Sequence, residues 1–155
     1  MATLAGPLVG HILSGFSAGF YYSFGMAEKS LTDISRDVRV LYQKGHDALS
    51  RENFDYAIEL FNQVLEKEPG LYECRKALRV AQAKKAGGGR GFFKKMLNSA
   101  SASPLVAKGQ LALRKNPAEA LQVAEQILNS DPHSSAGHRL VVEAATALEL
   151  PRTAA

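Results

Sequence analysis

The chain has 155 residues and a formal net charge of +4, with 46% hydrophobic, 22% charged and 8% aromatic residues. Such a composition excludes a disordered chain, fits one globular domain, and favours a helical protein over a β-sandwich. The only cysteine, Cys74, excludes an internal disulfide and a cysteine-based metal site, so the cytoplasm is the expected compartment.

The apolar N-terminal segment, residues 1–27, carries no charged side chain and contains five glycines. It is long enough to cross a membrane, which takes about 20 apolar residues, but its hydrophobicity is marginal. Glycines four residues apart, at Gly6/Gly10 and Gly15/Gly19, have the spacing at which membrane helices pack closely. Three interpretations stay open. A weak membrane or interface helix and a gene start placed too early, with the true start at Met26, are ranked about equal. A secretory signal ranks below both, because the segment lacks basic residues at its start.

Helical periodicity follows this segment, because apolar residues recur at steps of three and four. Residues 30–33 offer N-caps for a first helix, which ends at the polar break 51–53. A second helix is predicted over 54–67, where Pro69-Gly70 stops its apolar stripe.

The middle of the chain predicts a third helix over 71–86, a glycine-rich break over 87–91 and a short, weaker helix over 92–100. Pro104 suits the first turn of the helix that comes next. The three remaining helices are predicted over 104–114, 118–129 and 134–150.

An internal repeat is the strongest signal in the sequence. Two segments that begin at Ala57 and Ala120 carry matching residues at steps of 1, 4, 7, 8 and 12. The first contains Ala57, Ile58, Phe61, Val64, Leu65 and Pro69, and the second contains Ala120, Leu121, Ala124, Ile127, Leu128 and Pro132. Small residues at Gly45 and Ala57 let two antiparallel helices approach closely.

These residues resemble the tetratricopeptide repeat, in the form found in bacterial proteins. The positions that match its pattern in the first copy are Gly45, Phe54, Ala57, Phe61 and Pro69. Leu41 stands where a large aromatic residue is common, and Val64 stands where a small residue is usual. In the second copy, Ala124 replaces the aromatic residue and Pro117 stands near the turn.

The resemblance covers about residues 38–150 and implies an all-α, right-handed α-solenoid of helical hairpins. The two copies are offset by 63 residues, nearly twice the ~34-residue period of the family, so a middle unit fits between them. The implied organisation is the N-terminal segment 1–27, a first hairpin 30–69, a degenerate middle repeat 70–103, a second clear hairpin 104–132 and an incomplete last repeat 133–155. The chain therefore looks truncated at its C-terminus, and self-association through an uncovered helix face is a further expectation.

The resemblance also implies a protein-interaction scaffold or adaptor, not an enzyme, which uses no cofactor and binds a peptide or helix of a protein partner. Its groove is lined by the first helix of each hairpin, and matching by position places six candidates there: Arg39, Tyr42, His46, Lys76, Gln110 and Arg139. Tyr42 and His46 stand where some members carry a Lys and an Asn that clamp a C-terminal carboxylate, so binding of a chaperone tail is not expected. A surface residue without a ligand is the competing interpretation at each position.

A block without Asp or Glu runs from Cys74 to Ala118 and contains eleven basic residues. Its densest part is interleaved with Phe92 and Phe93 and consists of Lys84, Lys85, Arg90, Lys94 and Lys95. This basic patch is typical of nucleic-acid binding, here through the block 75–115, or of contact with an anionic membrane. A solvated face with core phenylalanines is favoured over both. A membrane-associated assembly factor, anchored by residues 1–25, is the remaining alternative.

Catalytic and metal-binding chemistry has little support. The four histidines are His11, His46, His133 and His138, and the last two are five apart, a spacing that suits zinc poorly on a helix. The glycine-rich run 87–91 lacks the Gly-Lys-Ser/Thr ending of a phosphate-binding loop. No metal site is predicted.

Overall fold

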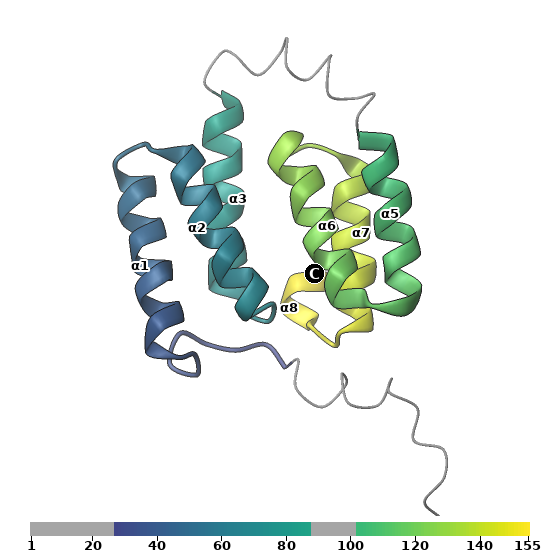
Figure 1. Ribbon diagram of the computed structural model, residues 1–155, viewed down its shortest axis with the longest axis horizontal. Helices are drawn as coiled ribbons and strands as arrows, with labels where there is room; N and C mark the ends of the chain where they lie inside the picture. The colour runs from purple at the N-terminus through teal and green to yellow at the C-terminus, as the bar shows by residue number, and fades with distance from the viewer. Residues whose placement is uncertain (1–26, 88–101) are drawn as a thin grey trace, which may run out of the picture.

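The computed structural model describes residues 27–87 and 102–155 (Figure 1). Among these residues the chain forms helices and a single isolated bridge between Lys29 and Leu71, which confirms the all-α class. The helices are α1 (Arg36–Ser50), α2 (Phe54–Lys67), α3 (Tyr72–Gly87), α5 (Ala102–Lys115), α6 (Pro117–Ser130), α7 (Ser135–Ala147) and α8 (Pro151–Ala154). The predictions for residues 1–26 and for the short helix 92–100 lie outside the described residues.

Side-chain caps explain where the helices begin. Asn53 accepts a hydrogen bond from the backbone of Tyr56 at the start of α2, and Asn116 does the same for Glu119 in α6. The predicted caps at 30–33 do not cap α1. Asp33 instead accepts hydrogen bonds from Ser30, which close a separate turn and lower the pKa of the Asp33 carboxyl. Helix α1 therefore begins later, with Ser35 as its N-cap.

The described helices form two copies of one three-helix unit. Helices α2 and α6 have 14 residues each and begin 63 residues apart, and α3 and α7 also begin 63 residues apart. The N-terminal unit comprises α1 to α3, and the C-terminal unit comprises α5 to α7 with α8 added at its end. Each unit buries a hydrophobic cluster of its own, one centred on Phe61 and Leu78 and the other on Leu121 and Leu128.

Two glycines permit the close helix packing within these units. A Cβ atom at Gly45 in α1 would lie 2.6 Å from a ring carbon of Phe61 in α2. At Gly109 in α5, a Cβ atom would collide with Leu140 of α7 and lie 3.3 Å from Val123 of α6. The expected role of Gly45 in bringing two helices together is thereby confirmed.

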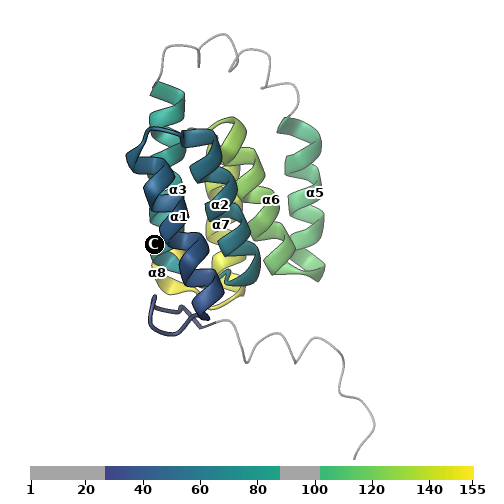
Figure 2. The same cartoon turned by 60° about the vertical axis from the view of Figure 1, so that its left-hand side comes forward.

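The two units meet through α2 against α6 and α3 against α8. In both views of the molecule α6 lies between α3 and α5 (Figures 1 and 2). First helices of neighbouring hairpins were expected to line one continuous groove, and at this junction α3 and α5 do not lie side by side. The faces that meet are instead those of the second helices, α2 and α6.

The two ends of the described chain close over this junction. Glu28 accepts a hydrogen bond from the backbone of Thr153 in α8, at 2.8 Å, and Lys29 pairs with Glu68 at 2.7 Å. The last helix was predicted to continue to residue 150, but α7 ends at Ala147 because Glu149 adopts a φ of 57° and Pro151 starts α8. The turn places Leu150 in the core, where it is fully buried.

Candidate binding groove between the two units

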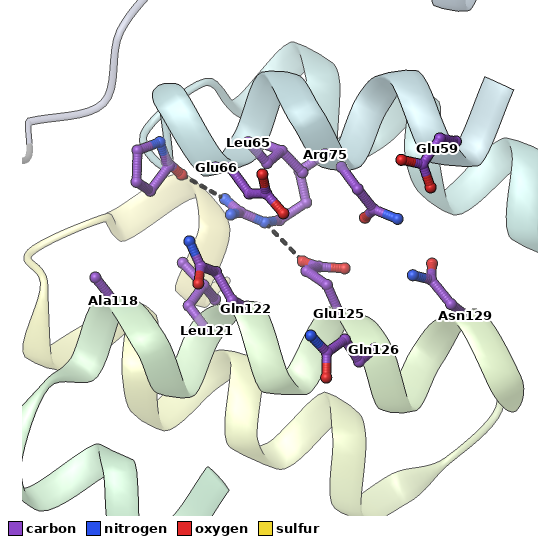
Figure 3. Close-up of a pocket in the computed structure, with 12 residues that line it drawn as sticks. Glu59, Leu65, Glu66, Arg75, Ala118, Leu121, Gln122, Glu125, Gln126 and Asn129 are labelled. Atoms are coloured by element: carbon purple, nitrogen blue, oxygen red, sulfur yellow. Dashed lines mark hydrogen bonds and ion pairs between the residues drawn. The ribbon is translucent and has the colours of Figure 1, made fainter. Parts of the chain in front are cut away.

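A polar groove with a volume of about 280 Å³ lies where α2 faces α6 (Figure 3). The wall from α2 presents Glu59, Asn62 and Glu66, and the wall from α6 presents Gln122, Gln126 and Asn129. The groove is also lined by the apolar residues Leu65, Pro69, Ala118 and Leu121. The groove is thus rich in amide and carboxylate groups, which bind by hydrogen bonds and charge.

The two walls come from equivalent positions of the two units. Glu59 and Gln122 are 63 residues apart, and the same offset separates Glu66 from Asn129. In Figure 3, Glu59 and Asn129 lie toward one end of the groove and Glu66 and Gln122 toward the other, so α2 and α6 run antiparallel. The two walls are therefore related by an approximate two-fold symmetry, with one carboxylate and one amide at each end of the groove.

An ion pair between Arg75 of α3 and Glu125 of α6 forms the floor of the groove. Arg75 Nε donates to Glu125 Oε1 at 3.0 Å, and each side chain is only 6% exposed. Arg75 Nη1 also donates to the carbonyl of Pro69 at 3.0 Å and to Thr153 Oγ1 at 3.2 Å. One guanidinium thus binds the α2–α3 turn, α6 and α8 together, and its buried charge is well satisfied.

Two further residues of α3 extend this network. Arg79 Nη2 donates to Glu125 Oε1 at 3.0 Å, and Arg79 Nη1 donates to Gln82 Oε1 at 2.8 Å. The buried Gln82 in turn donates to Asn129 Oδ1 at 2.6 Å. Residues of α3 therefore hold Glu125 and Asn129 of α6 through hydrogen bonds, so this wall of the groove is positioned before a ligand binds.

The negative charge that remains available lies at the ends of the groove. Glu125 is neutralised by Arg75 and Arg79. Glu59 and Glu66 are exposed, and neither forms an ion pair within residues 27–87 and 102–155. The groove consequently has an acidic character, although the whole chain is basic.

The candidates predicted on α1 fall on a different face. Tyr42 and His46 pack edge to face at 4.6 Å between ring centroids, and both rings contact Phe61. Partial burial, with smaller contributions from Cys74 and Glu73, raises the pKa of the Tyr42 hydroxyl. Arg39 donates to the backbone carbonyls of residues 31, 32 and 34, so its guanidinium holds the segment before α1.

The other predicted candidates are spread over both units. Lys76 of α3 is exposed and lies 5.8 Å from the ring centroid of Tyr72. Gln110 of α5 is exposed, and Arg139 of α7 is paired with Glu143 at 3.8 Å. The structure therefore brings Tyr42 and His46 together, whereas Gln110 and Arg139 belong to the C-terminal unit.

Four of the eleven basic residues in the block pair with carboxylates from outside it. Besides Arg75 and Arg79, Lys85 pairs with Asp55, and Lys108 lies 3.9 Å from Glu119. Lys84 is exposed. The remaining members of the predicted basic patch, Arg90, Lys94 and Lys95, lie outside the described residues.

The positions of Arg75 and Glu125 in the sequence could have indicated the groove floor. Arg75 stands four residues after Leu71 and three before Leu78, and Glu125 stands four after Leu121 and three before Leu128. Each charge therefore interrupts an apolar helical stripe, a position where a charged side chain needs a partner. The wall residues Glu59, Glu66 and Gln122 carry no such mark.

The part of the chain that the structure describes offers no cluster of three or more His, Cys, Asp and Glu residues for a metal ion. In the same residues, none of the helices has the length and hydrophobicity to cross a bilayer. Comparisons with models of protein families, with curated proteins and with solved structures found no match to this chain.

Proposed function

We propose that this chain is a protein-interaction module of the tetratricopeptide type, a scaffold or adaptor that binds a segment of a partner protein in the groove between α2 and α6. The observation that supports the proposal best is the groove floor, in which the buried Arg75–Glu125 pair fixes both walls. A groove with fixed walls loses little conformational entropy on binding, which favours recognition of a flexible segment.

The repeat organisation supports the same proposal. Two units with a common offset of 63 residues, each with a glycine packed against a bulky side chain of a neighbouring helix, fit a short right-handed solenoid. Repeat proteins of this kind bury their cores by stacking and present extended surfaces to partners. In this proposal the regular stacking is interrupted at the junction, and the interruption creates the groove.

A peptide selection on the full chain tests the proposal. A library of linear 12-residue peptides is displayed and selected against the wild-type protein, and the enriched peptides are then measured against two variants. Gln122→Ala with Gln126→Ala changes the groove. Tyr42→Ala with Lys76→Ala changes the candidates on α1 and α3 of the N-terminal unit, and is called the α1–α3 variant. Gln122, Gln126 and Lys76 are exposed, and Tyr42 is half-buried, so circular dichroism is checked for both variants.

We expect enriched peptides to bind the wild type and the α1–α3 variant equally, and the groove variant at least about tenfold more weakly, a change of about 1.4 kcal/mol. If only the α1–α3 variant bound the peptides more weakly, the binding site would be the face that carries Tyr42 and His46. If no peptide were enriched, the chain would not be a peptide-binding module.

A further inference from the structure

We infer that the groove selects a basic segment, in which two Lys or Arg side chains stand three positions apart on a polyproline II backbone. The inference rests on the proposed function and adds the chemistry of the partner. It is carried by the arrangement of charge, amides and spacing in the walls between α2 and α6.

Each end of the groove has the groups that a basic side chain needs. Glu59 and Asn129 line the groove at one end, and Glu66 and Gln122 line it toward the other (Figure 3). An ammonium has three N–H donors and a guanidinium has five, so a carboxylate alone leaves donors unsatisfied. At the Glu66 end the amide oxygen of Gln122 accepts one of them, and at both ends the charge-assisted bond to the carboxylate supplies the stronger contact.

The two end carboxylates are open to a ligand, in contrast to the carboxylate of the floor. Gln63 Nε2 donates to Glu59 Oε1 at 3.1 Å, which orients Glu59 without neutralising it. Glu125 is occupied by two arginines, so a cation in the middle of the groove gains little from it. The two end carboxylates, Glu59 and Glu66, therefore favour a ligand with two separated cations over a ligand with one.

The spacing of the carboxylates favours a particular backbone. Glu59 and Glu66 are seven residues apart on α2, and a rise of 1.5 Å per residue separates them by about 10.5 Å along the helix axis. A polyproline II chain rises 3.1 Å per residue with three residues per turn, so positions i and i+3 face the same side about 9.3 Å apart. In a β-strand, residues three apart face opposite sides. Long basic side chains span the remaining difference of about 1 Å.

The amides of α6 complete the match with this backbone. Gln82 donates to Asn129 Oδ1, which leaves the amide nitrogen of Asn129 as a donor toward a ligand. A polyproline II segment has no internal hydrogen bonds, so its carbonyls are available to accept from such donors. Backbone contacts of this kind bind without regard to the intervening side chains, and the two basic residues supply the selectivity.

The test uses a defined probe and the full chain. The fluorescein-labelled peptide Ser-Lys-Pro-Pro-Arg-Ser is titrated by fluorescence anisotropy, beside a peptide with Gln at both basic positions and a peptide with the two basic residues adjacent. The protein variants are Glu59→Gln with Glu66→Gln, and a matched control, Asp47→Asn with Glu143→Gln, which removes the same charge from α1 and α7. All four side chains are exposed, and circular dichroism confirms that both variants keep their helices.

We expect the probe to bind the wild type and the matched control equally, and the groove variant about tenfold more weakly, since each exposed ion pair contributes up to about 1 kcal/mol. Both control peptides should also bind about tenfold more weakly than the probe. Equal binding by the matched control, which loses the same charge elsewhere, would separate this preference from general electrostatic attraction.

Three results would overturn the inference. They are the absence of measurable probe binding, equal binding of the probe to both charge variants, and equal binding of the Gln peptide. If one of these results came while library-selected peptides without basic residues still lost affinity for the Gln122→Ala, Gln126→Ala variant, the inference would fall while the proposed function stood. If neither the probe nor any selected peptide bound, both would fall.

Discussion

Arg75 and Glu125 are 50 residues apart in the chain, yet their side chains meet at 3.0 Å and hold the two helical units together. A buried pair of this kind is stabilising only while both partners are present, because each charge alone has lost its water. The contact therefore couples the stability of the junction to the shape of the groove above it.

Removal of one partner is expected to destabilise the protein strongly. Glu125→Ala leaves the buried Arg75 without its carboxylate partner and should lower the free energy of unfolding by about 3 kcal/mol or more. Arg75→Ala should cost less, because Glu125 keeps its ion pair with Arg79. Replacement of both, as Arg75→Leu with Glu125→Leu, should cost clearly less than the sum of the single Leu variants. Urea denaturation followed by circular dichroism measures all of these values, and additive costs would contradict the pairing.

A methyl group at Gly45 or Gly109 is expected to disrupt helix packing within one unit. Gly45→Ala places a Cβ atom 2.6 Å from the Phe61 ring, and the overpacking should cost about 1–3 kcal/mol. Gly109→Ala should have a similar effect through Leu140. Gly87→Ala is the control, because a Cβ atom there has no neighbour within 4 Å among the described residues, and it should leave the melting temperature unchanged or slightly raised.

The thiol of Cys74 is expected to make stability fall at alkaline pH. Burial raises the pKa of this thiol well above its ordinary value of 9.0, and the neutral thiol donates to the carbonyl of Phe61. Above about pH 9 the unfolded chain loses the thiol proton while the folded chain keeps it. The free energy of unfolding should therefore decrease by about 1.4 kcal/mol per pH unit from this group.

Cys74→Ser removes that titration and keeps a hydroxyl donor. The free energies of unfolding of the two proteins are measured by urea denaturation from pH 8 to pH 10.5, and the difference in their pH dependence gives the contribution of the thiol. A parallel loss in both proteins would show that other groups are responsible. Iodoacetamide, which reacts with the thiolate, should label Cys74 in the wild type only when the chain unfolds.

Loss of α8 is expected to weaken the junction more than loss of its exposed arginine. Arg152→Ala removes an exposed ion pair with Glu73 and a contact 4.2 Å from the Tyr72 ring centroid, and should cost about 1 kcal/mol. Deletion of residues 151–155 also removes Thr153, the partner of Arg75 and Glu28, and should cost more. Equal melting temperatures for the two variants would mean that α8 does not close the junction.

Local sequence was sufficient for the boundaries of α2 and α6. Asn53 and Asn116 cap α2 and α6 through neighbouring backbone groups, and Pro69 follows the end of α2, so these boundaries depend on residues a few positions away. The match between the segments at Ala57 and Ala120 likewise predicted two equivalent helices. Such features can be read from sequence because they arise from periodicity and capping along a single helix.

Only the tertiary structure decided which faces meet. Arg75 and Arg79 belong to a stretch without any acidic residue, so the sequence alone suggested a positive surface, and Glu125 neutralises them from the other unit. The walls of the groove are exposed helix positions whose neighbours depend on how the two units dock. Contacts between residues 46 to 79 positions apart follow from that docking, and helical periodicity contains no information about it.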